Sequence, residues 1–272
     1  MSISKRLEDA RSAYEKKDVV ASAQAHEQKR IQNAAKEEHG SEGSRYLSSL
    51  VYGGLDGIIT TFAVVSGVMG AQLSPGVIII LGLANLLGDG FSMGTGAYLS
   101  SKSDHEYYDR EKSREAWEIE HFPEGEKLEL LEIYKKQGYP LTDARKMVQI
   151  KIANPQRWVD AMMVEELGLL KDERVPLKEA LATFAAFIVC GSLPLLVYLI
   201  ALIAGIHLQP DTAFYISLLL SALALFGLGA AKFFVTQRSP WRSGLEMLLV
   251  GGSAAAVAYG VGALLRGFGI GV

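Results

Sequence analysis

The sequence predicts an all-α integral membrane protein with five transmembrane helices and a cytoplasmic helical insert between the second and the third. Two observations predict this fold. Five apolar stretches are each long enough to cross a hydrocarbon core of about 30 Å, which takes roughly 20 helical residues. The charged residues, 21% of the 272-residue chain, are concentrated elsewhere. Residues 1–45 hold nine Lys or Arg and eight Asp or Glu, and residues 101–178 hold fourteen and seventeen.

The five apolar stretches lie at residues 46–72, 75–100, 179–206, 211–235 and 241–265. Each must be helical, because lipid offers backbone N–H and C=O groups no hydrogen-bond partner. We therefore divide the chain into a helical N-terminal tail (1–45), transmembrane helices 1 and 2 (46–100), an acidic helical insert (101–178) and transmembrane helices 3 to 5 (179–272). The expected surroundings are a lipid bilayer, and no nucleic-acid partner is expected.

The distribution of basic residues predicts the orientation in the membrane. The links at residues 71–76 and 205–211 contain no Lys or Arg, whereas the N-terminal tail, the insert and the link after the fourth span carry nearly all of them. By the positive-inside rule, the N-terminus and the insert are cytoplasmic, and five spans leave the C-terminus outside. The single cysteine, Cys190, lies in the third span, so we expect no disulfide and no thiolate metal site.

The insert is expected to be a small bundle of helices without strands. Helical patterning continues from the second span to about residue 120, stops at 122–125, resumes to 137, breaks at 138–140, and returns at 141–152 and 155–170.

Two carboxylates interrupt the first two spans at matching depth. Asp56 lies about ten residues from the start of the first span and Asp89 about eleven from the end of the second, so each is about 15 Å deep at a helical rise of 1.5 Å. A charge near the bilayer centre costs about 3 kcal/mol, which makes such residues functional candidates. Asn85, Asp89 and Met93 follow at intervals of four and share one helix face.

Carboxylate and amide oxygens with a thioether suit Fe²⁺ better than Mg²⁺, so these four side chains outline an ion site. The alternative is that Met93 only packs against its neighbours. The separate alternative for Asp56 and Asp89 is a buried N-cap or a hydrogen-bond partner for an unwound turn, because glycines lie beside both residues.

The first helix of the insert carries an acidic stripe, and the last helix adds two glutamates. The stripe consists of Asp104, Glu111, Glu115 and Glu118, with Glu106 and Asp109 beside it, and the last helix places Trp158, Met162, Glu165 and Glu166 on one face. Like charges four residues apart destabilise a helix, so the stripe needs either solvent or a counter-ion. One interpretation is that carboxylates from two helices bind cations. The other is a solvated surface, because basic residues are interleaved.

Glu118 and His121 form one E-x-x-H pair, which is half of the ligand motif of a ferritin-like di-iron site. Such sites require the motif on two helices, and the sequence contains one. A di-iron membrane oxidase is therefore kept only as the enzymatic alternative.

These motifs resemble the vacuolar iron transporter family over residues 45–265. The resemblance is carried by "YGGLDGIITTFAVVSGVMGA", by "GLANLLGDGFSMGTGAYLSSKS", by an acidic insert that ends in "WVDAMMVEELGL", and by three further spans. It implies a homodimeric transporter, not an enzyme, that exports Fe²⁺ and often Mn²⁺ from the cytosol in exchange for protons. The divalent metal is then the bound and transported ion, and no prosthetic group is expected.

The resemblance also implies roles for single residues. Asp56 and Met93 match the ion ligands of a pore that lies between two subunits, and Asp89 is an added candidate at the same depth. The glutamates of the insert would collect cations at the pore entrance. That role falls to Glu111, Glu115, Glu118 and Glu166, with Glu106, Asp109, Met163 and Glu165 as further members.

The chain departs from the family pattern at two places. It has "SDHEYYD" where family members carry paired glutamates early in the insert, and "SRYLSSL" where some relatives place an acidic residue at the start of the first span. The second departure puts proton coupling through that position in doubt. The tail is longer than in plant members, which suggests a bacterial or archaeal cell membrane.

Two other function classes remain open. A protein that binds metal in the insert without a permeation path would be a membrane-bound sensor or buffer, and a flux measurement in liposomes separates it from a transporter. An oxidase would consume oxygen with Fe²⁺. The oxygen and thioether ligands admit Fe²⁺, Mn²⁺, Co²⁺ and Zn²⁺ alike.

Overall fold

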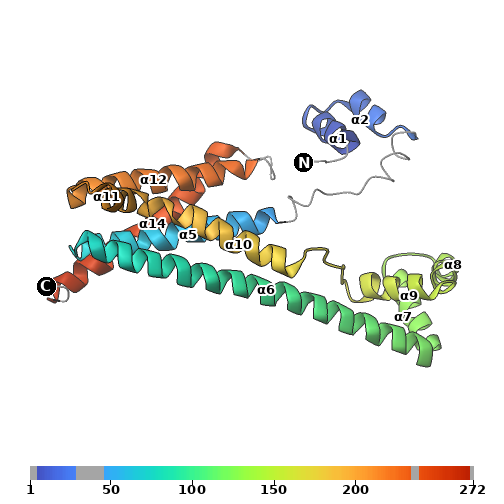
Figure 1. The fold of residues 1–272 in the computed structure, drawn as a ribbon. Helices are drawn as coiled ribbons and strands as arrows, with labels where there is room; N and C mark the ends of the chain where they lie inside the picture. The colour runs from blue at the N-terminus through green and yellow to red at the C-terminus, as the bar shows by residue number, and fades with distance from the viewer. Residues whose placement is uncertain (1–4, 29–45, 234–238, 270–272) are drawn as a thin grey trace. The chain divides into compact units, whose positions relative to one another are not determined.

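The computed structural model describes residues 5–28, 46–233 and 239–269 (Figure 1). Every regular element in these ranges is a helix, which confirms the expected all-α fold. The chain divides into two compact units, one formed by residues 1–95 with 177–272 and the other by residues 96–176. The second unit begins five residues before the expected insert (101–178) and ends two residues before the expected end.

Five helices in the first unit are long and apolar enough to cross a membrane, as predicted. They are α5 (Leu47–Gly70), the first part of α6 (Pro75–His121), the helical segment Pro176–Ala204, α12 (Pro210–Ala231) and α14 (Pro240–Gly267). The protein is therefore an integral membrane protein. The predicted end of the fourth span at residue 235, and Arg238 in the basic link after it, lie outside the described residues.

The third span is not the single helix that the sequence suggested. It consists of α10 (Pro176–Gly191), a 3₁₀ turn η2 (Leu193–Leu195) and α11 (Leu196–Ala204). The reason is Pro194, which has no N–H to continue the helical bonding pattern. Ser217 of α12 donates a hydrogen bond to the Pro194 carbonyl at 2.6 Å, so a neighbouring helix satisfies backbone at the break.

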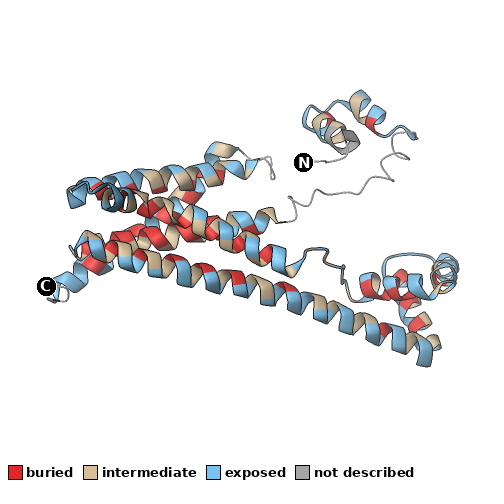
Figure 2. Ribbon diagram, viewed as in Figure 1, coloured by how far each residue is buried: buried red, intermediate tan, exposed pale blue. Residues whose placement is uncertain are grey.

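Helix α5 lies at the centre of the membrane unit and packs against α12 and α14. Half of its most apolar stretch is buried within the protein, a larger share than in the other four spans (Figure 2). Its contact with α10 is very close, because a Cβ added at Gly57 would lie 2.5 Å from the Phe187 carbonyl oxygen. Gly53 makes the same kind of approach to the Thr183 carbonyl. This close approach is what the small-xxx-small spacing of the two glycines predicts.

The insert unit is a bundle with its own apolar core. The C-terminal part of α6 is followed by α7 (Pro123–Lys136), α8 (Leu141–Ile152), α9 (Pro155–Ala161) and a π-helical turn η1 (Met162–Glu166). The core residues are Leu130, Tyr134, Ala144, Val148, Trp158, Ala161 and Met162. Figure 2 shows buried positions in α7 and α9, where these helices pack together.

Two boundaries in the insert differ from the prediction. The expected break at 122–125 is reduced to Phe122, because Pro123 occupies the first turn of α7, where its missing N–H is not needed. The last helix ends at Glu166 instead of residue 170, and Gly168 follows with φ at 65°, a conformation that glycine adopts without strain.

The N-terminal tail begins with the helices α1 (Lys5–Glu15) and α2 (Val19–Ala25), which contact each other. Asp18 caps α2 by accepting a hydrogen bond from the Ala21 N–H at 3.0 Å. The rest of the predicted tail, residues 29–45, lies outside the described residues.

Candidate metal centre

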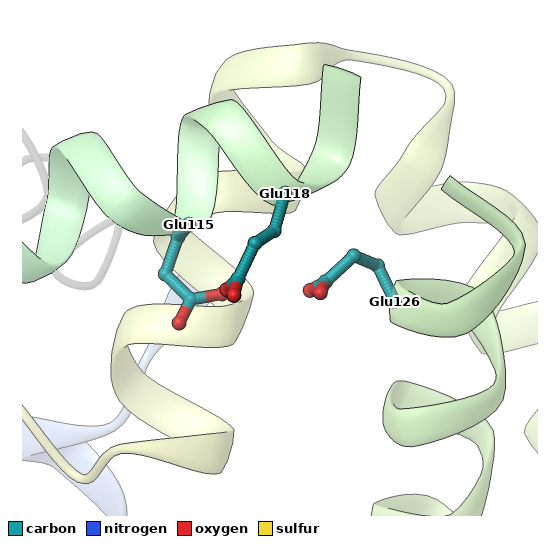
Figure 3. A group of neighbouring side chains, drawn as sticks. All are labelled: Glu115, Glu118 and Glu126. Atoms are coloured by element: carbon teal, nitrogen blue, oxygen red, sulfur yellow. The ribbon is translucent and has the colours of Figure 1, made fainter. Parts of the chain in front are cut away.

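Five glutamates of the insert form two overlapping groups of carboxylates. The first group is Glu115, Glu118 and Glu126, and the second is Glu126, Glu129 and Glu166. In each group, one oxygen from every residue lies within 4.8 Å of the others. Figure 3 shows how the first group is built: Glu115 and Glu118 project from α6 toward Glu126 on α7. Oxygen atoms gathered in this way are suitable ligands for a divalent cation.

Two carboxylates in these groups are deeply buried and only partly satisfied. Glu115 is 0% exposed and Glu126 is 5% exposed. The Oε2 atoms of both residues are buried and accept no hydrogen bond from the described part of the chain. Burying a carboxylate oxygen without a partner costs free energy, and a bound cation would offset that cost.

Burial and mutual repulsion change the acidity of these groups. Burial raises the pKa of Glu115 to about 7, with a further contribution from Glu166 and an opposing one from Arg114. Burial and the charge of Glu115 raise the pKa of Glu126 to about 7. The pKa of Glu166 is also raised, first by burial and then by Glu129. Near neutral pH, Glu115 and Glu126 therefore keep a share of their protons when no metal is bound, and a metal ion must displace those protons.

The structure brings together three glutamates that the sequence singled out, Glu115, Glu118 and Glu166. It adds Glu126 and Glu129, which the sequence interpretation missed. A signal for the missing pair is present in the spacing, because the E-x-x-E pattern of residues 115–118 recurs at 126–129. On a helix, this spacing places both carboxylates on one side.

Glu111 has basic partners and belongs to neither group. Its Oε1 accepts hydrogen bonds from Arg110, and its Oε2 accepts one from Arg114 at 3.0 Å. These bonds, with Arg110 as the larger contribution, lower the pKa of Glu111. Glu111 is therefore paired within its own helix, whereas the residues above face one another across helices.

Four other predicted members also lie outside the two groups. Glu106 and Asp109 are exposed on α6, and Glu106 pairs with Lys102 at 3.6 Å. Glu165 accepts a hydrogen bond from Lys151 at 2.9 Å. Met163 is fully buried in the π-helical turn that also carries Glu166, and such turns occur frequently at functional sites.

His121 does not join the carboxylates. Its Nδ1 lies 2.8 Å from the Trp117 carbonyl oxygen, and its ring stacks on the Trp117 ring with centroids 4.3 Å apart. Within the described residues, neither carboxylate group contains a histidine. The half-motif of a di-iron oxidase therefore has no counterpart in this geometry.

The membrane unit brings the two intramembrane aspartates near each other. Asp56 on α5 and Asp89 on α6 are close enough for their charges to interact. Both are half-buried and lie inside continuous helices, so neither caps an unwound turn. On the same stripe, Met93 packs partly against the core, and the Asn85 Nδ2 is buried with no protein partner in the described residues.

The chain is similar to known proteins over most of its length. The family model described as "VIT family" matches residues 47–263. A vacuolar iron transporter of Toxoplasma gondii is 41% identical over 96% of this chain and 88% of its own length. A vacuolar iron transporter of Plasmodium falciparum is 36% identical over 97% of this chain and 98% of its own length. Vacuolar iron transporter 1 of Arabidopsis thaliana is 34% identical over 82% of this chain and 87% of its own length.

The long N-terminal tail does not indicate a prokaryotic source. The Toxoplasma and Plasmodium alignments cover 96% and 97% of the chain, so most of the tail is matched in relatives that are neither bacterial nor archaeal. The expectation of a bacterial or archaeal membrane loses its basis.

Proposed function

The chain belongs to the VIT family, and from this premise we propose that it transports Fe²⁺, and secondarily Mn²⁺, out of the cytosol in exchange for protons. The observation that carries the proposal is the convergence of five glutamates in the insert, two of which have buried carboxylate oxygens without a partner among the described residues. The relatives named vacuolar iron transporters support iron as the substrate.

In the proposed mechanism, the insert collects the cation. Carboxylate oxygens bind divalent ions, and the negative field of the five glutamates raises the local cation concentration. Because the pKa values of Glu115 and Glu126 are raised to about 7, binding a metal at neutral pH releases protons from these groups. Helix α6 then runs on into the membrane unit, where it carries Asp89 and Met93.

The intramembrane ligands are Asp56 and Met93, with Asp89 and Asn85 as polar neighbours. A carboxylate that holds either a metal ion or protons stays close to neutral in both states, which reduces the cost of charge in a low-dielectric region. The thioether of Met93 favours softer divalent ions over Mg²⁺.

The transporter is proposed to act as a homodimer. Asp56, Asp89 and Asn85 are only half-buried in a single chain, and a charged side chain facing lipid is costly. A second copy packed over this face would cover them and enclose a pathway between the subunits. Cross-linking in native membranes should give a dimer, and a monomer at every cross-linker concentration would contradict this.

The N-terminal tail and the insert are proposed to lie in the cytosol and the C-terminus on the opposite side, as the basic residues predict. A reporter fused after Val272 should be active only on the far side of the membrane. Activity in the cytosol would overturn this topology.

Flux in liposomes tests the transport proposal against a sensor or buffer. Wild-type protein should move Fe²⁺ across the bilayer under anaerobic conditions, and Asp56→Asn should abolish this flux while assembling normally. Asp211→Asn, the same change in the first turn of α12, is the matched control and should retain flux. Metal binding without flux in the wild type would favour a sensor, and oxygen consumption with Fe²⁺ would favour an oxidase.

A further inference from the structure

The side chain of Arg114 lies among the carboxylates of the insert and bonds to three of them. Its Nε donates to Glu111 Oε2 at 3.0 Å and its Nη2 to Glu115 Oε1 at 2.5 Å, while its Nη1 donates to Glu118 Oε2. A guanidinium group presents its donors in a rigid planar fork that fits carboxylate oxygens. All three of its nitrogens are therefore engaged by acidic side chains.

Two of these carboxylates also belong to the first candidate metal group. Glu115 and Glu118 share that group with Glu126. Arg114 occupies one oxygen of Glu115, while the other oxygen of the same carboxylate is buried and has no partner in the part of the chain that the structure describes. A divalent ion that uses Glu115 and Glu118 must compete with the guanidinium for their oxygens, because two cations at such close range repel each other.

We infer that Arg114 is a tethered competitor cation, which holds the carboxylates of the insert when no metal is bound and yields them to a divalent ion. This inference rests on the proposed function, since it takes the glutamates to be a metal site. Its consequence is a threshold: metal binds only when it outcompetes the arginine, so the insert binds more weakly than its ligands alone would allow. A weaker site releases its ion to the transport pathway more readily.

The structure supplies a second position for the displaced arginine. Glu111 lies outside both metal groups and already accepts a hydrogen bond from Arg114. When Glu115 and Glu118 turn to a metal ion, Arg114 can keep its bond to Glu111. Its side chain is 40% exposed, so the guanidinium can move toward solvent without disturbing the apolar core.

No other described cation is placed to act in this way. Among the described residues, Arg114 is the one basic side chain with an ion pair to any of the five glutamates. Neighbouring lysines are paired elsewhere: Lys112 with Asp160, Lys127 with Glu124, and Lys151 with Glu165. Arg110 contacts Glu111 alone among the acidic side chains, which makes it a matched control.

The test compares Mn²⁺ binding to four full-length proteins in lipid nanodiscs, with free Mn²⁺ measured by its paramagnetic resonance signal. They are the wild type, Arg114→Gln, Arg110→Gln and Arg114→Lys. Binding that is lost in Glu115→Gln/Glu126→Gln is assigned to the insert.

We expect Arg114→Gln to tighten insert binding about tenfold, which corresponds to about 1.4 kcal/mol. Arg110→Gln removes the same charge one helical turn away and should stay within about twofold of wild type, since a solvent-exposed charge acts weakly at a distance.

Arg114→Lys keeps the charge but loses the fork, so its affinity should lie between wild type and Arg114→Gln. It also serves as the second variant if Arg114→Gln does not assemble. Equal tightening in Arg114→Gln and Arg110→Gln would show a general field effect and overturn the inference, as would unchanged or weaker binding in both Arg114 variants. If the wild type shows no insert-dependent Mn²⁺ binding, the proposed role of the insert fails first, and this inference with it.

Discussion

Glu126 belongs to both carboxylate groups of the insert, and its side chain is buried between them. It should therefore contribute more to metal binding than an exposed glutamate near the start of α7. We expect Glu126→Gln to weaken metal binding by at least about tenfold, because even outer-shell partners of metal ligands typically contribute about 10- to 100-fold. Titration calorimetry of the full chain measures this change. Glu124→Gln is the matched control, since Glu124 is exposed on the same helix and pairs with Lys127.

An equal loss in Glu124→Gln and Glu126→Gln would mean that the insert attracts cations only through its overall charge. An unchanged affinity in Glu126→Gln would remove it from the site. Either result would restore the interpretation of the acidic stripe as a solvated surface.

The raised pKa values of Glu115 and Glu126 give the metal-free insert a defined pH dependence. Both are raised from 4.5 to about 7, so between these values the folded state binds protons that the unfolded chain has lost. Their contribution to stability is therefore present at low pH and is lost as the pH rises from about 5 to about 8. Thermal unfolding followed by the insert tryptophans Trp117 and Trp158, in a Trp241→Phe background, should show this decline.

Glu115→Gln/Glu126→Gln should flatten that decline, because it removes the two groups with raised pKa values. Saturating Mn²⁺ should reverse the trend, since the metal binds the deprotonated carboxylates and stabilises the state that it binds. A metal-free insert that becomes more stable as the pH rises through 7 would contradict the assigned direction.

At single positions, sequence reasoning found residues whose chemistry is unusual for their surroundings and missed those whose importance depends on packing. Asp56 and Asp89 stand out in apolar stretches, and the structure places their charges near each other. The recurring E-x-x-E spacing places Glu126 and Glu129 on one side of their helix, but it does not indicate that this side of α7 faces α6. The burial that distinguishes it is a property of the folded bundle.

The crossing of α5 and α10 is set by two facing glycines. A Cβ at Gly57 would lie 2.5 Å from the Phe187 carbonyl oxygen, and one at Gly191 would lie 2.8 Å from the Gly57 carbonyl oxygen. Gly57→Ala should therefore push the helices apart and destabilise the protein by about 1–3 kcal/mol, as overpacking does in well-packed interiors. It should also reduce flux, since Asp56 is the adjacent residue on α5.

The control is Gly67→Ala on the same helix. A Cβ at Gly67 would lie 3.5 Å from the Ala258 carbonyl oxygen, which is an ordinary contact distance. Thermal stability in detergent and flux in liposomes should both distinguish the two variants. Equal tolerance of both changes would contradict the close packing of α5 on α10.

At the level of elements, hydropathy predicted the five spans well because backbone in lipid must form helices. It missed the break at Pro194, since the apolar residues around the proline continue without interruption. Hydropathy measures the free energy of moving side chains from water to lipid, whereas this break arises from one missing backbone N–H. Ser217 on another helix donates a hydrogen bond to the Pro194 carbonyl at the break. The π-helical turn at the end of α9 was also missed, because the pattern of apolar and polar residues there is that of an ordinary α-helix.

For the whole molecule, the segregation of charge along the chain predicts a membrane unit and a separate acidic unit, and the structure divides at residues 95–96 and 176–177. The same segregation gives the two units different roles in the proposed transport cycle. In the proposed cycle, Fe²⁺ collected by the insert enters a membrane unit whose first two spans contain two carboxylates, Asp56 and Asp89. The charge carried across the membrane then depends on how many protons these carboxylates return.

If both aspartates exchange protons for one Fe²⁺, the cycle moves two charges each way and is electroneutral. Transport in liposomes should then be accelerated by a pH gradient that is acidic on the far side and unaffected by a K⁺ diffusion potential, whereas each uncompensated charge would contribute about 2.3 kcal/mol per 100 mV. Asp89→Asn removes one of the two proton carriers, so its remaining flux should become sensitive to voltage. A pH-sensitive dye inside the liposomes reports the counterflow of protons directly. If wild-type protein moves metal without moving protons, and its flux follows the voltage, the protein is a channel or uniporter instead. The reason is that proton exchange at the aspartates compensates the charge of the ion, whereas a channel or uniporter leaves that charge uncompensated.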